Sequence, residues 1–286
     1  MGKPSRESMT SVQFYDCPVV MPYYGGKFRL SKQLVPMLAT HDRYFEVFAG
    51  GLSMFFRKPK AEISVVNDID NDIVNLYTCV ITQFDKLIDT LYWLPKSREI
   101  FNDSKSAVKD TKDITIPDVA RAAKYFYCIR NGFNKIPTGT FSKTSTWNTS
   151  EIIENLKYSR TFFDDTTIEN LDFRKLITDY KPKQGDMWYL DPPYIIATER
   201  GDYYMADFKE DEHEDLRECV DLIDRSDAKF MISYDDREVV RDMYSDFNIY
   251  EIETQYAGRN AEDVKYFIEL VITNYECEPP QMEMFI

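Results

Sequence analysis

Short apolar runs recur along the chain, and most of them stop at a charge or at a turn residue. The runs at 44–48, 62–66, 187–190 and 229–234 are continuous, as expected for strands buried on both faces of a parallel sheet. Two further runs within 249–273 are joined by a short glycine-containing connection. That arrangement predicts an antiparallel pair of strands at the edge of the sheet.

Helical patterns separate these strands. Leu30, Leu34 and Leu38, for example, recur four residues apart. The patterns predict helices at 28–39, 54–56, 71–93, 118–130, 173–180 and 210–225. Strands that alternate with helices indicate an α/β fold, and the strand, glycine turn and helix at 44–56 are typical of Rossmann-like sheets that bind nucleotides.

The composition fits a protein with a large core, since 43% of the 286 residues are hydrophobic. Such a chain forms either one enlarged α/β domain or a core with an inserted module. No apolar run is long enough to span a bilayer, and the N-terminus lacks the apolar segment of a signal peptide. We therefore expect a cytoplasmic protein with no membrane partner.

The sequence gives little support for a metal site or for disulfide bonds. The five cysteines are scattered and include no C-x-x-C pair, and there are only two histidines. We expect reduced thiols and no metal site. The net charge of −14 also argues against non-specific binding of a polyanion. If nucleic acid is the substrate, the basic residues must be concentrated on one face.

The stretch Asp191-Pro192-Pro193-Tyr194 is the strongest candidate for chemistry. Neither proline can donate to a sheet ladder, so the strand must end at Asp191, where open α/β sheets bind their ligands. The Asp191 carboxylate and the Pro192 carbonyl could accept the two hydrogens of an exocyclic amine while Tyr194 stacks on the ring. This cluster suits transfer to the amine of adenine. A strand-ending turn with a packed tyrosine is the alternative.

Two glycine stretches precede predicted helices. Gly25-Gly26-Lys27 places backbone donors and a cation where an anion could bind, although a simple turn explains it equally well. Gly50-Gly51 follows a strand and lets a ligand approach the backbone. Asp68 ends the next strand, where a carboxylate can accept from two ribose hydroxyls. Asp70 could serve instead as the cap of the following helix.

The order of these motifs resembles the Dam family of adenine-specific DNA methyltransferases. The resemblance is carried by Tyr-x-Gly-Gly-Lys at 23–27, Phe-Ala-Gly-Gly at 48–51, Asn-Asp-Ile-Asp at 67–70 and Asp-Pro-Pro-Tyr at 191–194. It covers residues 22–275 and implies S-adenosylmethionine (AdoMet) as the cofactor and double-stranded DNA as the substrate. Leu52 departs from the family, because many members have a further glycine there.

Carried over by position, the resemblance implies a cofactor site and assigns its residues. They are Tyr23, Gly25, Lys27, Phe48, Gly50, Asp68, Asp172, Phe173 and Asp191. Asp172 would accept from the amine of the cofactor's adenine and Phe173 would stack beside that ring. Capping of the helix at 173–180 is the other explanation for Asp172.

The resemblance also implies a target-recognition insert between the two halves of the core. Its expected DNA-binding residues are Arg121, Lys124, Arg130, Asn131, Asn134, Lys135 and Lys143. Arg130 would contact guanine, because a guanidinium pairs with the O6/N7 edge through two hydrogen bonds. A solvated helix end is the alternative for Arg130. The segment 138–147 is polar and strand-like, and 195–207 has the composition of a flap over a substrate pocket.

These observations divide the chain into four parts. Residues 1–83 and 166–275 form the two halves of a Rossmann-like methyltransferase core, 84–165 form a mainly helical recognition insert, and 276–286 form a tail. The tail, from Gln281 to Phe285, resembles the short peptides by which replication proteins dock on a sliding DNA clamp. Packing or fraying of the tail would explain it equally well.

We therefore expect an enzyme that transfers a methyl group from AdoMet to the N6 amine of an adenine flipped out of double-stranded DNA, as in restriction-modification systems. Two alternatives remain open. One is an RNA adenine methyltransferase, because the same turn can act on RNA. The other is a catalytically idle module that binds AdoMet or docks on a clamp.

Overall fold

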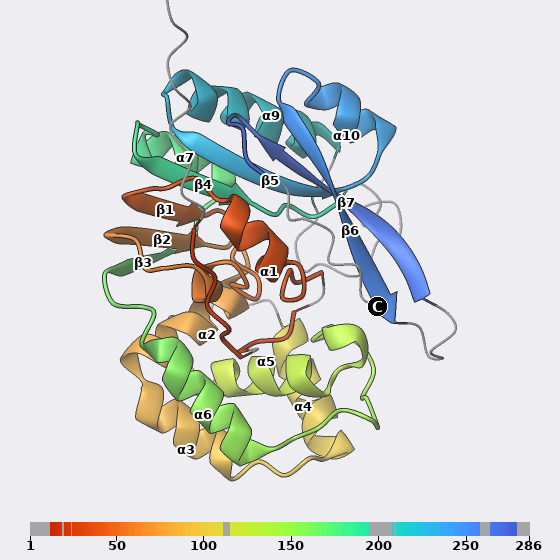
Figure 1. Cartoon of the computed structure of the whole chain (residues 1–286). Coiled ribbons are helices and arrows are strands. Elements are labelled where there is room, and N and C mark those ends of the chain that lie inside the picture. Colours follow the sequence, from red (N-terminus) through yellow and green to blue (C-terminus); the bar gives the residue numbers. More distant parts are fainter. Residues whose placement is uncertain are drawn as a thin grey trace, which may run out of the picture.

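The computed structural model describes residues 12–18, 20–23, 25–110, 115–194, 208, 210–257 and 264–278. It contains a seven-stranded sheet in the order β3-β2-β1-β4-β5-β7-β6 (Figure 1). The strands are β1 Arg43–Glu46, β2 Ile63–Asn67, β3 Thr166–Glu169, β4 Asp186–Leu190, β5 Lys229–Asp235, β6 Asn248–Ala257 and β7 Val264–Thr273. The expected α/β fold with a Rossmann-like sheet is confirmed.

Strand directions follow the expectation as well. β3, β2, β1, β4 and β5 are parallel neighbours, whereas β7 runs antiparallel to both β5 and β6. The antiparallel edge pair is thus confirmed. Residues 258–263, which include most of the predicted connection, lie outside the described residues.

The helices are α1 Ser31–Leu34, α2 Asn71–Thr82, α3 Phe84–Tyr92, α4 Arg98–Lys109, α5 Val119–Asn131, α6 Thr149–Arg160, α7 Phe173–Tyr180, α9 Glu210–Arg225 and α10 Glu238–Met243. Short 3-10 turns stand at η1 Val35–Met37, η2 Phe55–Arg57 and η3 Phe133–Lys135. None of the described helices is long and apolar enough to cross a membrane.

Four predicted elements differ from the structure. The helix expected at 54–56 is only the 3-10 turn η2. The helix expected at 28–39 begins only at Ser31 and tightens into η1, where Pro36 has no N–H to continue the α-helical pattern. The helix expected at 71–93 is two helices, because Gln83 leaves helical geometry with φ −131° and ψ 30°. The segment 138–147 forms no strand, and its one ladder contact is the bridge between Gly132 and Phe141.

The central strands are buried on both faces, which explains their continuous apolar runs. On one face, Phe45, Trp188 and Leu190 join the cluster that includes residues of α7, α9 and α10. On the other, Tyr44 and Met187 join the cluster that includes residues of α2 and the insert. Figure 1 shows α9 and α10 together at the top and α3 to α6 at the bottom.

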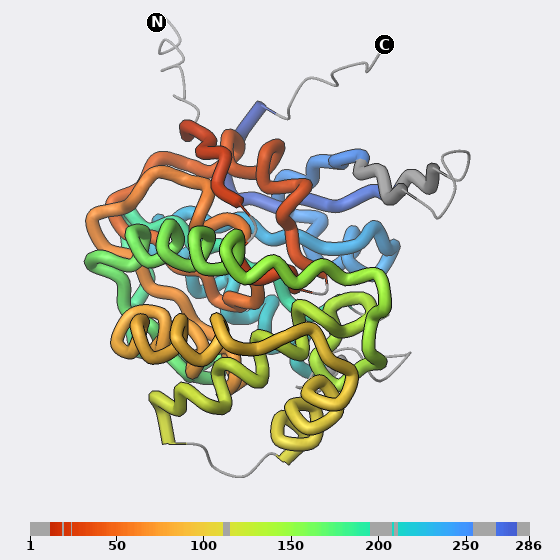
Figure 2. The backbone as a smooth tube through the Cα atoms, turned by 90° about the horizontal axis from the view of Figure 1, so that it is seen from below, coloured from red at the N-terminus to blue at the C-terminus, as the bar shows by residue number. Residues whose placement is uncertain are grey.

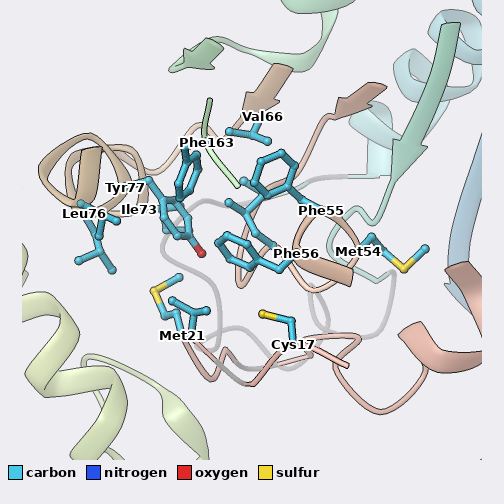
Figure 3. Packing of buried hydrophobic residues seen from close by; sticks show 14 of the residues in the cluster. Cys17, Met21, Met54, Phe55, Phe56, Val66, Ile73, Leu76, Tyr77 and Phe163 are labelled. Carbon is cyan, nitrogen blue, oxygen red and sulfur yellow. The ribbon is translucent and has the colours of Figure 1, made fainter. Parts of the chain in front are cut away.

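An aromatic cluster supports the turn after β1. Tyr77 of α2 lies near Phe163, with ring centroids 5.8 Å apart, and Phe163 also contacts Phe55 and Phe56 (Figure 3). The Tyr77 hydroxyl donates to the Gly50 carbonyl at 2.9 Å. The helix after β2 is therefore fixed directly to the glycine turn.

The segment 84–165 comprises α3, α4, α5, η3 and α6. From below, in Figure 2, these helices form a layer in front of the sheet. Their buried side chains belong to the same apolar cluster as α2 and one face of the sheet. The segment therefore packs continuously against the core.

A buried ion pair joins α5 of the insert to α2 of the core. The Arg121 guanidinium binds both carboxylate oxygens of Asp72, at 2.6 and 2.8 Å. It also donates to the carbonyls of Ala107, Val108 and Asp110 at the end of α4. One arginine thus links two insert helices to the core.

Replacing Arg121 by methionine should lower the free energy of unfolding by about 3 kcal/mol, because Asp72 would stay buried without its counter-ion. Urea unfolding followed by circular dichroism measures this. Lys124→Met, on the exposed side of the same helix, is the control and should change it by less than about 0.5 kcal/mol. Equal stability of the two variants would show that the ion pair does not hold the insert.

Candidate active site

A pocket lies at the carboxyl ends of β1, β2 and β4, beside the turn that begins at Asp191. Its volume is about 820 Å³, including its open mouth. It is lined by Tyr23, Gly25, Gly26, Lys27, Glu46, Phe48, Ala49, Gly50, Gly51, Leu52, Ser53, Met54, Asp68, Ile69, Asp70, Tyr189, Asp191, Pro193 and Phe208. Open α/β sheets bind ligands at this edge.

The glycine turn after β1 leaves no room for side chains. Gly50 has φ +45°, and a Cβ on it would lie 3.2 Å from the Tyr23 ring. A Cβ on Gly51 would lie 2.9 Å from the Met21 carbonyl oxygen. Leu52 also adopts a left-handed φ of +51°. Its side chain is fully buried, which offsets the roughly 1–2 kcal/mol that this conformation costs.

Asp68 faces the glycine turn across the pocket. Its carboxylate accepts from the backbone N–H of Gly50 at 2.9 Å and of Asp70 at 3.0 Å. Burial raises the pKa of Asp68 to about 6, and these N–H donors oppose the rise. Asp70 also lines the pocket, and it caps α2 by accepting from Asp72 N–H. The helix cap is therefore Asp70, which leaves Asp68 beside the glycine turn.

Aromatic rings form one wall of the pocket. Phe48 and Phe208 line it, with ring centroids 5.9 Å apart in an edge-to-face arrangement. Phe173 lies in contact with both rings but is buried and does not line the pocket. Phe208, which sequence analysis did not name, thus lines the pocket, and Phe173 packs behind it.

Asp172 is a helix cap in the structure. It accepts from Arg174 N–H at 2.9 Å and pairs with the Arg174 guanidinium at 2.7 Å. Its side chain is 41% exposed and does not line the pocket. The capping alternative describes this geometry, and the expected contact with the cofactor's adenine has no support in it.

Asp191 is held in place by Lys27 and Ser233. Lys27 Nζ lies 2.6 Å from Oδ1 of Asp191, and the Ser233 hydroxyl donates to the same oxygen at 3.1 Å. Within the described part of the chain, Oδ2 accepts no hydrogen bond from another protein group, which leaves it for a substrate donor. Burial raises the pKa of Asp191, against the opposing effect of Lys27 and Ser233.

Tyr194 lies beside this pair. The Lys27 ammonium is 4.8 Å from the centroid of the Tyr194 ring, and the Tyr194 hydroxyl donates to Glu269 of β7. Lys27 Nζ is also 3.4 Å from Glu269. The structure thus brings Lys27, Asp191 and Tyr194 together and adds Glu269.

Glu46 is a further pocket carboxyl that sequence analysis did not single out. It accepts from the Tyr44 hydroxyl at 2.8 Å, and burial raises its pKa to about 8. Its only sequence signal is a charge inside an apolar strand. Among the described residues, no group of three or more His, Cys, Asp or Glu side chains is arranged to hold a metal ion.

Two residues expected to bind DNA are used within the protein. The five N–H donors of Arg121 bind Asp72 and three carbonyls, as described above. Asn131 is buried, donates to the Tyr127 carbonyl and accepts from the Ser145 hydroxyl. Both side chains hold the insert together, and neither is available for DNA without breaking these bonds.

The remaining five candidates lie on α5 and on the segment that follows it. Lys124, Asn134 and Lys143 are exposed, whereas Arg130 and Lys135 are half-buried. Burial lowers the pKa of Lys135, and the nearby Arg130 adds to that shift. A Cβ on Gly132 would lie 2.4 Å from the Ile136 carbonyl oxygen, so the turn between these residues requires glycine.

Comparison with known proteins names the family. Residues 23–257 match the sequence profile described as D12 class N6 adenine-specific DNA methyltransferase. The chain belongs to this family. Methyltransferases of this class transfer a methyl group from AdoMet to adenine in DNA, and that is the reaction of this protein.

The similar proteins carry related names. The Type II methyltransferase M1.LlaDCHI of Lactococcus lactis subsp. cremoris is 27% identical over 88% of this chain and 93% of its own. The DNA N-6-adenine-methyltransferase of Escherichia phage P1 is 24% identical over 84% of this chain but only 33% of its own. The modification methylase StsI of Streptococcus sanguinis is 23% identical over 90% and 42%.

Solved structures are more distant. The putative methyltransferase yhhF of Escherichia coli aligns with 93% of this methyltransferase and 92% of its own chain, at 12% identity and a TM-score of 0.33. A precorrin-8w decarboxylase of Methanobacterium thermoautotrophicum aligns with 86% and 89%, at 8% identity and a TM-score of 0.40.

Replacing Asp172 by alanine should cost about 1 kcal/mol of stability through loss of the cap, and should change the Kd for AdoMet by less than about twofold. Isothermal titration of AdoMet and urea unfolding measure the two effects. A tenfold weaker Kd would restore the role in cofactor binding that the resemblance implied.

Proposed function

We propose that this protein is a site-specific DNA methyltransferase that modifies the N6 amine of an adenine flipped out of double-stranded DNA. The observation that carries the proposal is the geometry at Asp191. A carboxylate with one open oxygen stands at the end of β4, directly beside a pocket bounded by a glycine turn. We propose the cytoplasm as its location, where DNA of a cellular host lies.

The pocket residues fit AdoMet. Gly50 and Gly51 line the pocket without side chains, which suits close approach of a cofactor to the backbone. Asp68 offers a carboxylate for ribose hydroxyls, and Tyr23, Phe48 and Phe208 offer apolar surface for a planar base. AdoMet, when bound, supplies the electrophilic methyl group.

Asp191 and the Pro192 carbonyl align the amine of the target adenine. Oδ2 of Asp191 accepts one amine hydrogen and the Pro192 carbonyl accepts the other, which localises the nitrogen lone pair for attack. Tyr194 stacks on the flipped base. After transfer, the nitrogen loses a proton, and the Asp191 carboxylate is the acceptor nearest to it.

We assign DNA contacts to Lys124, Arg130, Asn134, Lys135 and Lys143 and leave out Arg121 and Asn131. The five lie around the end of α5 and on the segment that follows it. Two relatives are named as a Type II methyltransferase and a modification methylase, which supports a role in a restriction-modification system. The proposed clamp contact through Gln281 to Phe285 lies outside the described residues, and the proposed function does not include it.

Asp191→Ala should abolish N6-methyladenine formation in DNA, with a loss of at least about a thousandfold in kcat, because the amine loses its aligning acceptor. Mass spectrometry of nucleosides from unmethylated DNA and from RNA, after incubation with enzyme and AdoMet, measures the product. Wild-type product in RNA alone would favour the RNA methyltransferase, and no product in either would favour a binding module.

The matched control is Asp164→Ala. That carboxylate is 78% exposed, pairs only with the exposed Lys60 among the described residues and lies at the other edge of the sheet, before β3. It should keep wild-type activity. Activity retained by Asp191→Ala would overturn the proposed mechanism.

Arg130→Ala should weaken methylation of the native site by about 10- to 200-fold and relax the requirement for one guanine, since a two-bond guanine contact contributes about 1–3 kcal/mol of discrimination. Sequencing that maps methyladenine across a genome-sized DNA gives the site preference of each enzyme. Lys124→Ala should lower methylation of all sites alike. An unchanged site preference in Arg130→Ala would remove the guanine contact.

A further inference from the structure

Glu269 lies where β7 leaves the main sheet. Asp235 is the last residue of β5 and pairs with Glu269, whereas residues 264–268 of β7 pair only with β6. The carboxyl end of β5 belongs to the same edge of the sheet as the pocket. Glu269 therefore stands at the active-site edge, on a strand that no motif of the sequence marks.

The burial of Glu269 requires an explanation beyond packing. It is 6% exposed, and Leu270, Val271 and Ile272, which follow it, are fully buried apolar residues. An apolar side chain would be less costly to bury here than a carboxylate, unless the carboxylate binds partners that need it.

Its partners are the groups already assigned to the reaction. The Tyr194 hydroxyl donates to Oε1 of Glu269, and Lys27 Nζ lies 3.4 Å from the same oxygen. Lys27 is in turn only 2.6 Å from Asp191. The ammonium is thus shared between two carboxylates, and the tyrosine ring is anchored at its far end by one of them.

We propose that Glu269 is a positioning residue for methyl transfer, which fixes the Tyr194 ring against the target adenine and holds the Lys27 ammonium beside Oδ1 of Asp191. This rests on the proposed roles of Asp191 and Tyr194. Without the charge on Glu269, the ammonium loses its second carboxylate and is free to shift toward Oδ2 of Asp191, the oxygen that the amine of the substrate needs. A charged Glu269 keeps the ammonium between the two carboxylates and leaves Oδ2 to the substrate.

The surrounding charges give this arrangement a pH dependence. Burial raises the pKa of Glu269 to about 7, Lys27 opposes the rise, Asp191 adds to it and Tyr194 opposes it. The buried Tyr189 hydroxyl shares a hydrogen bond with the hydroxyl of Ser233, which also binds Asp191. Across β5, Asp235 is paired with Arg237. Because ionised Glu269 is the active form, kcat/KM should rise as the pH increases through about 7.

Glu269→Gln tests the proposal, since glutamine keeps the volume and an acceptor for Tyr194 but removes the charge. We expect kcat at pH 8 to fall by between about 10- and 100-fold, and the rise of kcat/KM near pH 7 to disappear. The melting temperature should stay within a few degrees of wild type. Glu253→Gln, an exposed carboxylate on the neighbouring β6, is the control and should behave as wild type.

A wild-type pH profile and kcat in Glu269→Gln would overturn the proposal, and so would a loss of activity that only follows loss of folded protein. A second measurement needs no catalysis: carbon-13 NMR of the glutamate carboxyls should show one that titrates near pH 7 and is absent from Glu269→Gln. If that carboxyl titrates near its usual value, the proposal fails. An inactive wild type would overturn the proposed function and this inference with it, whereas an active wild type together with an equally active Glu269→Gln would overturn this inference alone.

Discussion

The structure depends on keeping the Asp191 carboxylate charged in a place where water is scarce. The two prolines after it end β4 and leave the carboxylate 19% exposed at the sheet edge. Burial favours the protonated form, which could not accept both an amine hydrogen and the proton released later. Lys27 counteracts burial from a turn 164 residues earlier in the chain. This ion pair therefore joins the two halves of the core at the pocket.

The neighbouring positions of β1 and β4 make that ion pair possible. These strands are hydrogen-bonded neighbours, so the glycine turn after β1 and the proline turn after β4 emerge side by side. The insert is joined to the same region through polar contacts. Tyr125 of α5 donates to Asp70, which lines the pocket, and Arg121 binds Asp72 two residues further on, in the first turn of α2. Displacement of the insert would therefore change the geometry of the pocket.

Local chemistry made much of this predictable from the sequence. Prolines end a strand wherever they stand, and a glycine pair after an apolar run marks a tight turn, so Asp191, Gly50 and Asp68 could be named in advance. Contacts between distant segments could not. Nothing near Glu269 or Phe208 in the sequence marks them, because the fold alone brings them to the pocket.

The insert gives a second example of what the sequence alone does not predict. The resemblance assigns DNA binding to the basic residues of the insert by position, yet the structure separates them by use. Arg121 satisfies a buried carboxylate and carbonyls, whereas Lys124 on the same helix is exposed. The burial of each side chain decides whether it is available to DNA, and the positions of the charges in the sequence do not reveal that burial. The break between α2 and α3 at Gln83 was likewise not predicted, because no glycine or proline stands there.

The net charge of −14 can be reconciled with a DNA substrate through where the charges lie. Residues 84–165 carry thirteen Lys and Arg against eleven Asp and Glu, so the insert is slightly positive and all the excess negative charge lies outside it. Screening limits the reach of surface charges to about 8 Å at physiological salt. The acidic remainder of the protein therefore repels DNA only where it comes close. Exposed lysines around the end of α5 can attract phosphates locally, while the acidic surface elsewhere disfavours binding in other orientations.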